Sequence, residues 1–515
     1  MRRVFCFVLY VTSLAADNNG QLWWKHVQFL ADDKLEGRNT GSEGHRQAAA
    51  YVAEQFERLG LTAAGTQGYM QPVKFQTRQI DEPNSSLAIV RNGQTLPIEL
   101  GKQAYFNLRT NPAPSVKAPM IFIGYGLRVP EMKHDDLKGL KLKGKVVIIL
   151  SGGPTGWPGP LSAHVQSDNV RWESLRKLGA IGVISIPRVQ TVPWPRASAA
   201  RLQASMSAIA DESGQQVSLT FHPDQAEMLF AGSGHTAKEL LAFAAAEQPL
   251  PKFELSGELA ATIAVNRSEL ESPNVVAKLI GSHPKLKNEF VVISAHLDHL
   301  GKTTSFAGDG IFNGALDNAS GVAAMLEVAR QLKAGKPLDR SVLFVAVTGE
   351  EKGLQGSRYF AEKPTVPAKQ IVADCNMDMF MPLHPLKFLT LLGIDESTLG
   401  DTARTVAKEF DLPIIPDPTP EQRRFIRSDQ YSFIRAGIPS LAFKFGYEKG
   451  SPEEKLQAEW LKTRYHAVSD DLQQPIDIPA AGRFTEFLTA LVTRVAGQPQ
   501  RPSWKSDSFF KRFAK

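Results

Sequence analysis

The stretch FVVISAHLDHLG, residues 290–301, joins a run of apolar residues to three polar ones that are costly to bury. FVVIS has the composition of a strand that is buried on both faces, and His296, Asp298 and His299 follow it closely. Charged and imidazole side chains are rarely buried unless they are paired, hydrogen-bonded or bound to a metal. The stretch therefore predicts a strand that ends in a functional site.

Two further apolar runs end in the same way. SVLFVAVTGEE (341–351) ends in Glu350 and Glu351, and IVADCNMDM (371–379) reaches Asp378. Helical segments separate these runs, a pattern typical of a mainly parallel central sheet with helices on both faces. Ligands of such α/β sheets bind at the carboxyl ends of the strands, so we expect these side chains to meet there.

At 515 residues the chain is long enough for two domains or for one domain with a large insertion. From about residue 100 to 255, strand-like segments such as GKVVIIL alternate with loops rich in Pro and Gly, which predicts a smaller, β-rich α/β domain inserted into the main one. The expected division is a signal peptide (1–15), a first part of the main domain (16–99), the insertion (100–255), the rest of the main domain (256–500) and a basic tail (501–515).

The first residues have the pattern of a secretory signal: MRR, a short apolar run, and small residues that suit cleavage after Ala15 or Ala16. The apolar run is shorter than the roughly 20 residues of a membrane span, although an uncut anchor is the alternative. A net charge of +6 over this length does not indicate nucleic-acid binding. We expect the basic tail to be a frayed, solvated end.

The polar residues at the strand ends suffice for two metal ions. Each zinc takes about four nitrogen and oxygen ligands, and two zinc ions about 4 Å apart share a carboxylate. Besides the residues above, Asp317 begins the helix after the first strand and His466 follows much later. Glu350 and Glu351 can face one site only if the strand has ended, which Gly349 and Gly353 permit.

The motifs HLDHLG, ALDNASGVAAMLE, TGEEKGLQGS, CNMDM and the late YH together resemble the zinc exopeptidase family of aminopeptidases, which includes glutamate carboxypeptidase and the glutaminyl cyclases. The resemblance covers about residues 270–495. It implies two zinc ions, one held by His296 and Asp378 and the other by Glu351 and His466, with Asp317 bridging them.

The resemblance also implies the catalytic roles. Glu350 would be the general base, Tyr465 would hydrogen-bond the tetrahedral oxyanion, and Asp298 would orient His296 through its carboxylate. The peptide bond between Asp317 and Asn318 would be cis. The insertion more loosely resembles a protease-associated domain, which forms a lid or a wall of the substrate cleft in such enzymes.

Several polar residues have plainer interpretations. His299 is expected to be a loop residue or a donor to a ligand, and Cys375 a buried small hydrophobic residue. Ser428 and Asp429 either face the cleft or cap a helix, and Gln430 stands where the family commonly has histidine.

The sequence thus predicts an exported, periplasmic or extracellular di-zinc aminopeptidase that acts on peptides, with no nucleic acid as partner and no stable membrane span once the signal is removed. The alternatives on the same fold are a glutaminyl cyclase with one zinc, or a carboxypeptidase, for which Arg424 or Arg427 could bind the substrate carboxylate. A non-catalytic binding ectodomain is the remaining alternative, although no candidate ligand is missing.

Overall fold

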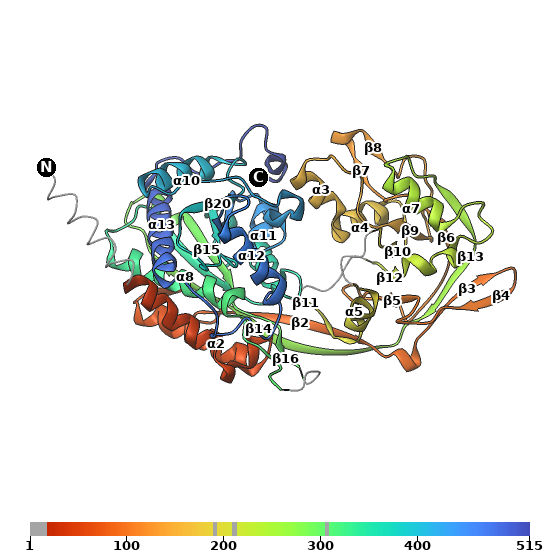
Figure 1. The fold of residues 1–515 in the computed structure, drawn as a ribbon, viewed down its shortest axis with the longest axis horizontal. Coiled ribbons are helices and arrows are strands. Elements are labelled where there is room, and N and C mark those ends of the chain that lie inside the picture. The colour runs from red at the N-terminus through yellow and green to blue at the C-terminus, as the bar shows by residue number, and fades with distance from the viewer. Residues whose placement is uncertain (1–17, 189–192, 209–213, 304–307, 515) are drawn as a thin grey trace. The chain divides into compact units, whose positions relative to one another are not determined.

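The computed structural model describes residues 18–188, 193–208, 214–303 and 308–514, which form two compact units (Figure 1). The main unit comprises the chain up to Lys74 and from Glu271 onward, and the inserted unit comprises Phe75–Leu270. The predicted insertion, residues 100–255, lies within the inserted unit, which extends further in both directions. The predicted signal peptide lies outside the described residues. None of the described helices is long and apolar enough to cross a membrane.

A mainly parallel sheet forms the centre of the main unit, as the apolar runs predict. Its four inner strands are mutually parallel, whereas β14 and β20 pair antiparallel with their neighbours. Six of the strands described for this sheet are, in sheet order, β14 (Val265–Leu279), β18 (Ser341–Val347), β15 (Phe290–His296), β19 (Ile371–Asn376), β21 (Ser440–Gly446) and β20 (Phe388–Leu392). Every residue of β15 and β18 is buried, which explains their continuous apolar sequences.

Helices cover both faces of this sheet, which confirms the predicted fold class. One face packs against α2 (Glu43–Arg58), α8 (Ser320–Ala334), α10 (Thr398–Glu409) and α13 (Ile478–Gly497). The other face packs against α9 (Gln355–Glu362) and α11 (Gln430–Arg435). Cys375 lies in the first of these cores, with 1% of its surface exposed, as expected of a small hydrophobic residue. A further helix, α12 (Pro452–Thr463), contributes the buried Trp460 to a smaller cluster beside the sheet.

The inserted unit has its own sheet. In sheet order its strands are β4 (Gln94–Pro97), β3 (Ser86–Arg91), β13 (Phe253–Thr262), β6 (Ser115–Phe122), β9 (Val146–Leu150), β10 (Gly182–Ile186), β12 (Val217–Phe221) and β5 (Ala104–Phe106). Asn92 and Gly93 form the turn between β3 and β4, both with positive φ, as their hairpin signal predicts. The helices include α3 (Gly159–Gln166), α4 (Asp168–Lys177) and α7 (Ala237–Ala245). The chain passes between the units in β2 (Met70–Ile80) and returns in β14.

The expectation of a solvated C-terminal tail is wrong. Trp504 and Phe510 are buried in a cluster with Phe425 and with residues of α11, and Phe509–Phe513 form a short helix. Lys505 pairs with Asp401 at 2.9 Å. The aromatic residues among the basic ones supply enough apolar surface to fix this segment against the main unit.

Candidate metal centre and active site

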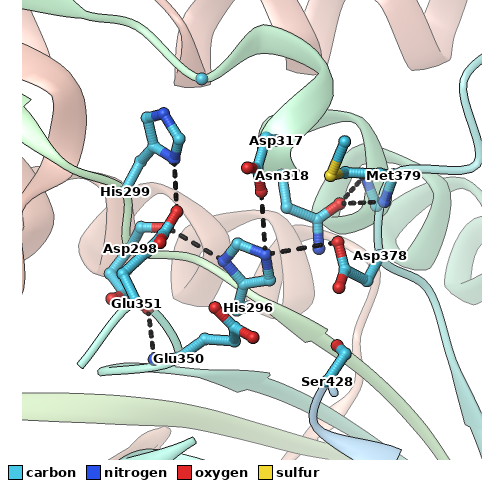
Figure 2. Close-up of polar contacts among 12 residues, drawn as sticks. His296, Asp298, His299, Asp317, Asn318, Glu350, Glu351, Asp378, Met379 and Ser428 are labelled. Carbon is cyan, nitrogen blue, oxygen red and sulfur yellow. Dashed lines mark hydrogen bonds and ion pairs between the residues drawn. The ribbon is translucent and has the colours of Figure 1, made fainter. Parts of the chain in front are cut away.

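The predicted site residues converge because three adjacent parallel strands end at one edge of the sheet. β15 ends at His296, β19 ends two residues before Asp378, and β18 ends at Val347, before Glu350 and Glu351. Gly349 and Gly353 have φ of 66° and 95°, so the backbone between them departs from a strand, as predicted. Figure 2 shows these side chains gathered around His296.

His296 lies at the centre of a first cluster. Its Nε2 atom is 3.2 Å from Asp317 Oδ1 and 3.6 Å from Asp378 Oδ1 (Figure 2). Burial disfavours a charged imidazole, but the carboxylates of Glu350, Asp317 and Asp378 outweigh it and raise the pKa of His296 well above its ordinary value. The ring is therefore surrounded by negative charge on the side where a cation could bind.

Asp317 also belongs to a second cluster. Its other oxygen, Oδ2, lies 3.3 Å from His466 Nε2, and the same nitrogen lies 3.3 Å from Glu351 Oε2. Asp317 thus presents one oxygen to each histidine, which is the geometry that a bridging carboxylate needs. The Asp317–Asn318 peptide bond is cis, as predicted.

The loop that carries Asp317 is held by groups that the sequence did not single out. Asp470 accepts hydrogen bonds from the backbone N–H groups of Leu316 and Asp317, both at 3.0 Å. Asn318 donates to the carbonyl oxygen of Met377 at 2.8 Å, which ties this loop to the end of β19. The acidic pair in HAVSDD, the segment that begins at His466, is the sequence feature that could have indicated Asp470.

Arg38, in the LEGRN segment near the N-terminus, is a second group that the sequence did not reveal. Its side chain is 1% exposed and donates to four backbone carbonyl oxygens, namely those of Leu30, Leu297 (3.0 Å), Asn313 (2.6 Å) and Gly314 (3.0 Å). Leu297 directly follows the candidate ligand His296, and Gly314 precedes the candidate ligand Asp317 by three residues. Burial lowers the pKa of Arg38 to about 10, so the guanidinium stays charged at neutral pH.

Asp298 lies beside His296, but not in the way we expected. His296 Nδ1 is 3.0 Å from the carbonyl oxygen of Asp298, not from its carboxylate. The carboxylate instead accepts hydrogen bonds from Thr40 Oγ1 at 2.8 Å and from the backbone N–H of Glu350 at 3.1 Å. Asp298 therefore fixes the backbone of Glu350 as well as the ring of His296.

Glu350 faces the same pocket as the two histidines. Burial, together with the carboxylates of Asp429, Glu351 and Asp378, raises the pKa of Glu350 well above its ordinary value, although His296 opposes the shift. Asp429 is fully buried, and burial raises its pKa to about 7. This concentration of buried carboxylates favours the binding of cations.

His299 contacts a candidate ligand. Its Nδ1 atom lies 2.8 Å from Glu351 Oε1, and its ring is fully buried. His299, Asp317 and Glu351 also bring ligand atoms within 4.8 Å of one another, as do His296, Asp317 and Asp378. The position suits a residue that orients Glu351, the role that we expected of a donor to a ligand.

Several of the remaining predicted residues line a pocket of about 150 Å³ together with the candidate ligands His296, Asp317, Asp378 and His466. Tyr465 lies on its wall, with its ring stacked on that of His466 at a centroid distance of 4.0 Å. Ser428 and Gln430 also line it, whereas Asp429, at the start of α11, makes no capping hydrogen bond. The cleft-facing alternative for this segment therefore fits the structure better than helix capping.

The residues present fit a metal ion. Asp378 Oδ1 is buried and, among the described residues, has no hydrogen-bond partner. Both histidines turn a ring nitrogen toward carboxylate oxygens at 3.2 to 3.6 Å. Imidazole and carboxylate groups together are the ligand set of zinc sites in hydrolases.

The sheet carries this cluster of potential metal ligands at its carboxyl edge, where α/β sheets bind their ligands. Residues 274–492 match the sequence model of peptidase family M28.

Known proteins with similar sequences match only part of the chain. The aminopeptidase YwaD of Bacillus subtilis is 28% identical over 194 residues, which are 37% of this chain and 39% of that protein. The probable lipoprotein aminopeptidase LpqL of Mycobacterium tuberculosis is 30% identical over 45% of this chain and 47% of its own length. The chain thus spans less than half the length of either relative.

A solved structure resembles the chain over nearly its whole length. The aminopeptidase from Aneurinibacillus sp. strain AM-1 aligns with a TM-score of 0.54 and 19% identity, covering 95% of this chain and 97% of that one. At this identity the likeness shows the fold alone, and it agrees with the predicted α/β class.

Proposed function

We propose that the chain is an exported, zinc-dependent aminopeptidase that removes N-terminal residues from peptides. The observation that carries the proposal is Asp317, whose two oxygens face His296 and His466 while Glu350 lies in the same pocket. The names of the two relatives as aminopeptidases support the same activity.

Two zinc ions would be held by five residues of the main unit. His296 and Asp378 would hold one ion, Glu351 and His466 the other, and Asp317 would bridge them, in line with the two clusters described above. When bound, zinc lowers the pKa of a water molecule and polarises the carbonyl group of the scissile bond. Related proteins named as zinc metalloproteases support the choice of metal.

Side chains of the protein would transfer the protons of the reaction. Glu350 would accept a proton at its carboxylate from the attacking water and pass it to the leaving amine. Its backbone N–H donates to the carboxylate of Asp298, which fixes the backbone at Glu350 beside the pocket. Tyr465 would donate its hydroxyl hydrogen to the oxyanion that forms on the substrate.

Two further parts of the proposal concern the rest of the chain. The predicted signal at residues 1–15 and a relative named as a lipoprotein support export. The inserted unit would be a protease-associated domain, which its separate sheet of parallel and antiparallel strands supports.

Metal content and product release test the proposal together. We expect two zinc ions per chain, with release of N-terminal residues from dipeptides and aminoacyl-anilides that a chelator abolishes. One zinc ion with cyclisation of N-terminal glutamine would replace the proposal by a glutaminyl cyclase. A protein without tightly bound metal or turnover would be a binding module instead.

A further inference from the structure

The C-terminal segment that the sequence predicted to be solvated packs behind one wall of the pocket. Residues 498–514, the C-terminal strap, follow α13 and lie beyond the part of the chain that matches the peptidase family model. The wall in question consists of Gln430, at the start of α11, and of Ser428 and Arg424 in the segment before it. Strap and wall both belong to the main unit, and the proposed reaction gives the strap no role.

The strap has a fixed course because it is anchored beside the start of α10. The backbone N–H of Thr398 donates to the carbonyl oxygen of Ser503 at 2.9 Å, and that of Lys505 donates to the carbonyl oxygen of Glu396 at 2.9 Å. Ser508 adds a side-chain hydrogen bond to the carboxylate of Glu396 at 2.6 Å. These contacts hold the strap independently of the pocket.

From this anchor the strap reaches the C-terminal end of α11. Trp504, which is 8% exposed, donates its indole N–H to the carbonyl oxygen of Gly437 at 3.0 Å. Gly437 has a φ of 93°, and the carbonyl oxygen of Phe513 leaves no room for a side chain there. The strap therefore lies directly on the backbone that leaves α11.

The strap also supports the segment before α11. Phe510 is fully buried and packs edge-on against Phe425, with ring centroids 5.3 Å apart. The carbonyl oxygen of Phe425 accepts a hydrogen bond from Gln430 Nε2 at 2.9 Å. The ring of Phe425 in turn fills the space over Gly393, directly after Leu392. Phe510 thus lies behind two residues that line the pocket, Leu392 and Gln430.

One hydrophobic cluster joins the strap to the pocket. Within it Trp504 and Phe510 lie with Phe425, while two other members, Leu392 and Ala442, line the pocket. Protein interiors are closely packed, so loss of volume on one side of such a cluster lets the other side shift. A change in the strap should therefore alter the shape of the pocket.

We propose that the C-terminal strap positions the α11 wall of the pocket and thereby sets the affinity and the size preference for the substrate's side chain. Trp504 and Phe510 are the positioning residues, because they contact the wall from behind. This inference rests on the proposed function, since it assigns the strap to the same pocket. The loop of Asp317 has a separate support in Asp470, so the strap should affect substrate binding more than metal binding.

Phe510→Leu is the main test, because it removes the ring but keeps the strap apolar. For Leu-p-nitroanilide we expect KM to rise by about 10-fold, with kcat within about 2-fold and zinc content unchanged. The ratio of kcat/KM between the Leu and Phe anilides should move toward one, since a loosened wall fits one size less well. Phe510→Met, which keeps more volume, should restore part of both effects.

A matched phenylalanine separates positioning from general stability. Phe487, on α13, is also fully buried and packs edge-on against Phe410, with ring centroids 5.9 Å apart. Phe487→Leu should lower the melting temperature about as much as Phe510→Leu but leave KM unchanged. An equal rise of KM in both variants would overturn the inference.

Trp504→Phe gives an answer even if Phe510→Leu fails to fold. It removes the indole donor to Gly437 but keeps an aromatic ring, and KM should rise several-fold. Trp194→Phe in the inserted unit is its control, because Trp194 is 9% exposed and donates to the carbonyl oxygen of Gly101 at 3.0 Å. KM should stay unchanged in this control. An unchanged KM in Trp504→Phe and in Phe510→Leu would overturn the inference.

Hydrogen exchange tests the wall without turnover. The amides of Ala436, Gly437 and Ile438 donate to carbonyl oxygens of α11, and in Phe510→Leu they should exchange at least about 10-fold faster. Faster exchange with an unchanged KM would overturn the inference, because the strap would then support α11 without setting substrate binding.

Calorimetry with Leu-Leu separates the inference from the proposed function. If the parent protein binds this dipeptide but hydrolyses no peptide, a weaker affinity in Phe510→Leu would keep the strap as a positioning element and overturn the aminopeptidase. Hydrolysis by the parent protein, with KM and affinity unchanged in Phe510→Leu, would keep the aminopeptidase and overturn the inference. Neither binding nor hydrolysis by the parent protein would overturn both.

Discussion

The two units are built from the same kind of strand but differ in the residues at the end of each strand and in the few residues that follow it. In the main unit, β15, β18 and β19 lead into His296, Glu350 and Asp378. In the inserted unit, β9, β10 and β12 are also parallel neighbours, yet they lead into SGGP, PRV and HPDQ. Both groups of potential metal ligands that the described residues form lie in the main unit. Burial of the strands therefore builds the sheet, and the residues after them decide whether it carries chemistry.

The units also differ in how they use buried polar groups. In the inserted unit, the buried Asp136 accepts the backbone N–H of Leu127 at 3.1 Å and so closes a local turn. In the main unit, Asp470 and Arg38 hold loops that carry candidate ligands, across more than 150 residues of sequence. In these examples, the long-range polar contacts of Asp470 and Arg38 fix loops that carry candidate ligands, whereas the contact of Asp136 closes a local segment.

The largest effect should come from Glu350→Gln. The variant removes the proposed base but keeps the shape of the side chain, so kcat/KM for an aminoacyl-anilide should fall by about 10³-fold. Metal content should stay unchanged. Glu254→Gln in the inserted unit is the matched control, because Glu254 is exposed and pairs with Lys145. Near-normal turnover by Glu350→Gln would exclude Glu350 as the base.

Asp317→Asn should act on metal binding. Loss of one anionic bridging oxygen should lower the zinc content from two ions to one or fewer per chain, as measured by elemental analysis. Asp135→Asn in the inserted unit should leave the zinc content unchanged, since Asp135 accepts a hydrogen bond from the nearby backbone N–H of Leu137. Two retained zinc ions in Asp317→Asn would remove this residue from the bridging position.

The sequence predicted the strand ends and the fold class because both follow from local pattern. His296, Glu350 and Asp378 stand directly after apolar runs, and glycines mark the irregular turn around Glu350. Arg38 could not be found in this way, because its four partners are carbonyl oxygens and any residue supplies one. The prediction of a solvated C-terminal tail was wrong because it rested on the basic residues of this segment and not on the spacing of its aromatic residues.

Arg38→Lys should weaken zinc binding without removing the metal centre. A lysine ammonium cannot reach the separate carbonyl oxygens of Leu297, Asn313 and Gly314, so the loops beside His296 and Asp317 should loosen. We expect about a 10-fold loss of zinc affinity in competition with a chelating dye, the scale of groups that orient ligands.

The inserted unit offers a matched arginine for this test. Arg171 is 4% exposed and donates to the carbonyl oxygen of Gly152 at 3.0 Å. Arg171→Lys should lower the stability of the protein but leave zinc affinity unchanged. An equal loss of zinc affinity in both variants would mean that Arg38 acts through general stability.

The smallest effect concerns acid stability. His45, in α2 of the main unit, is fully buried with Nδ1 3.1 Å from Ser272 Oγ, and burial together with Arg38 and Arg46 lowers its pKa to about 3. In the unfolded chain this histidine has its ordinary pKa of about 6.5, so between about pH 6.5 and pH 3 the unfolded chain binds more protons than the folded chain. The free energy of unfolding therefore falls as the pH falls through this window. Between about pH 7 and about pH 5.5 this one residue should cost about 1 kcal/mol. Urea unfolding at both pH values should show that His45→Gln loses less stability on acidification than the parent protein. An unchanged pH dependence in His45→Gln would assign the acid sensitivity to other groups and leave His45 a neutral packing residue.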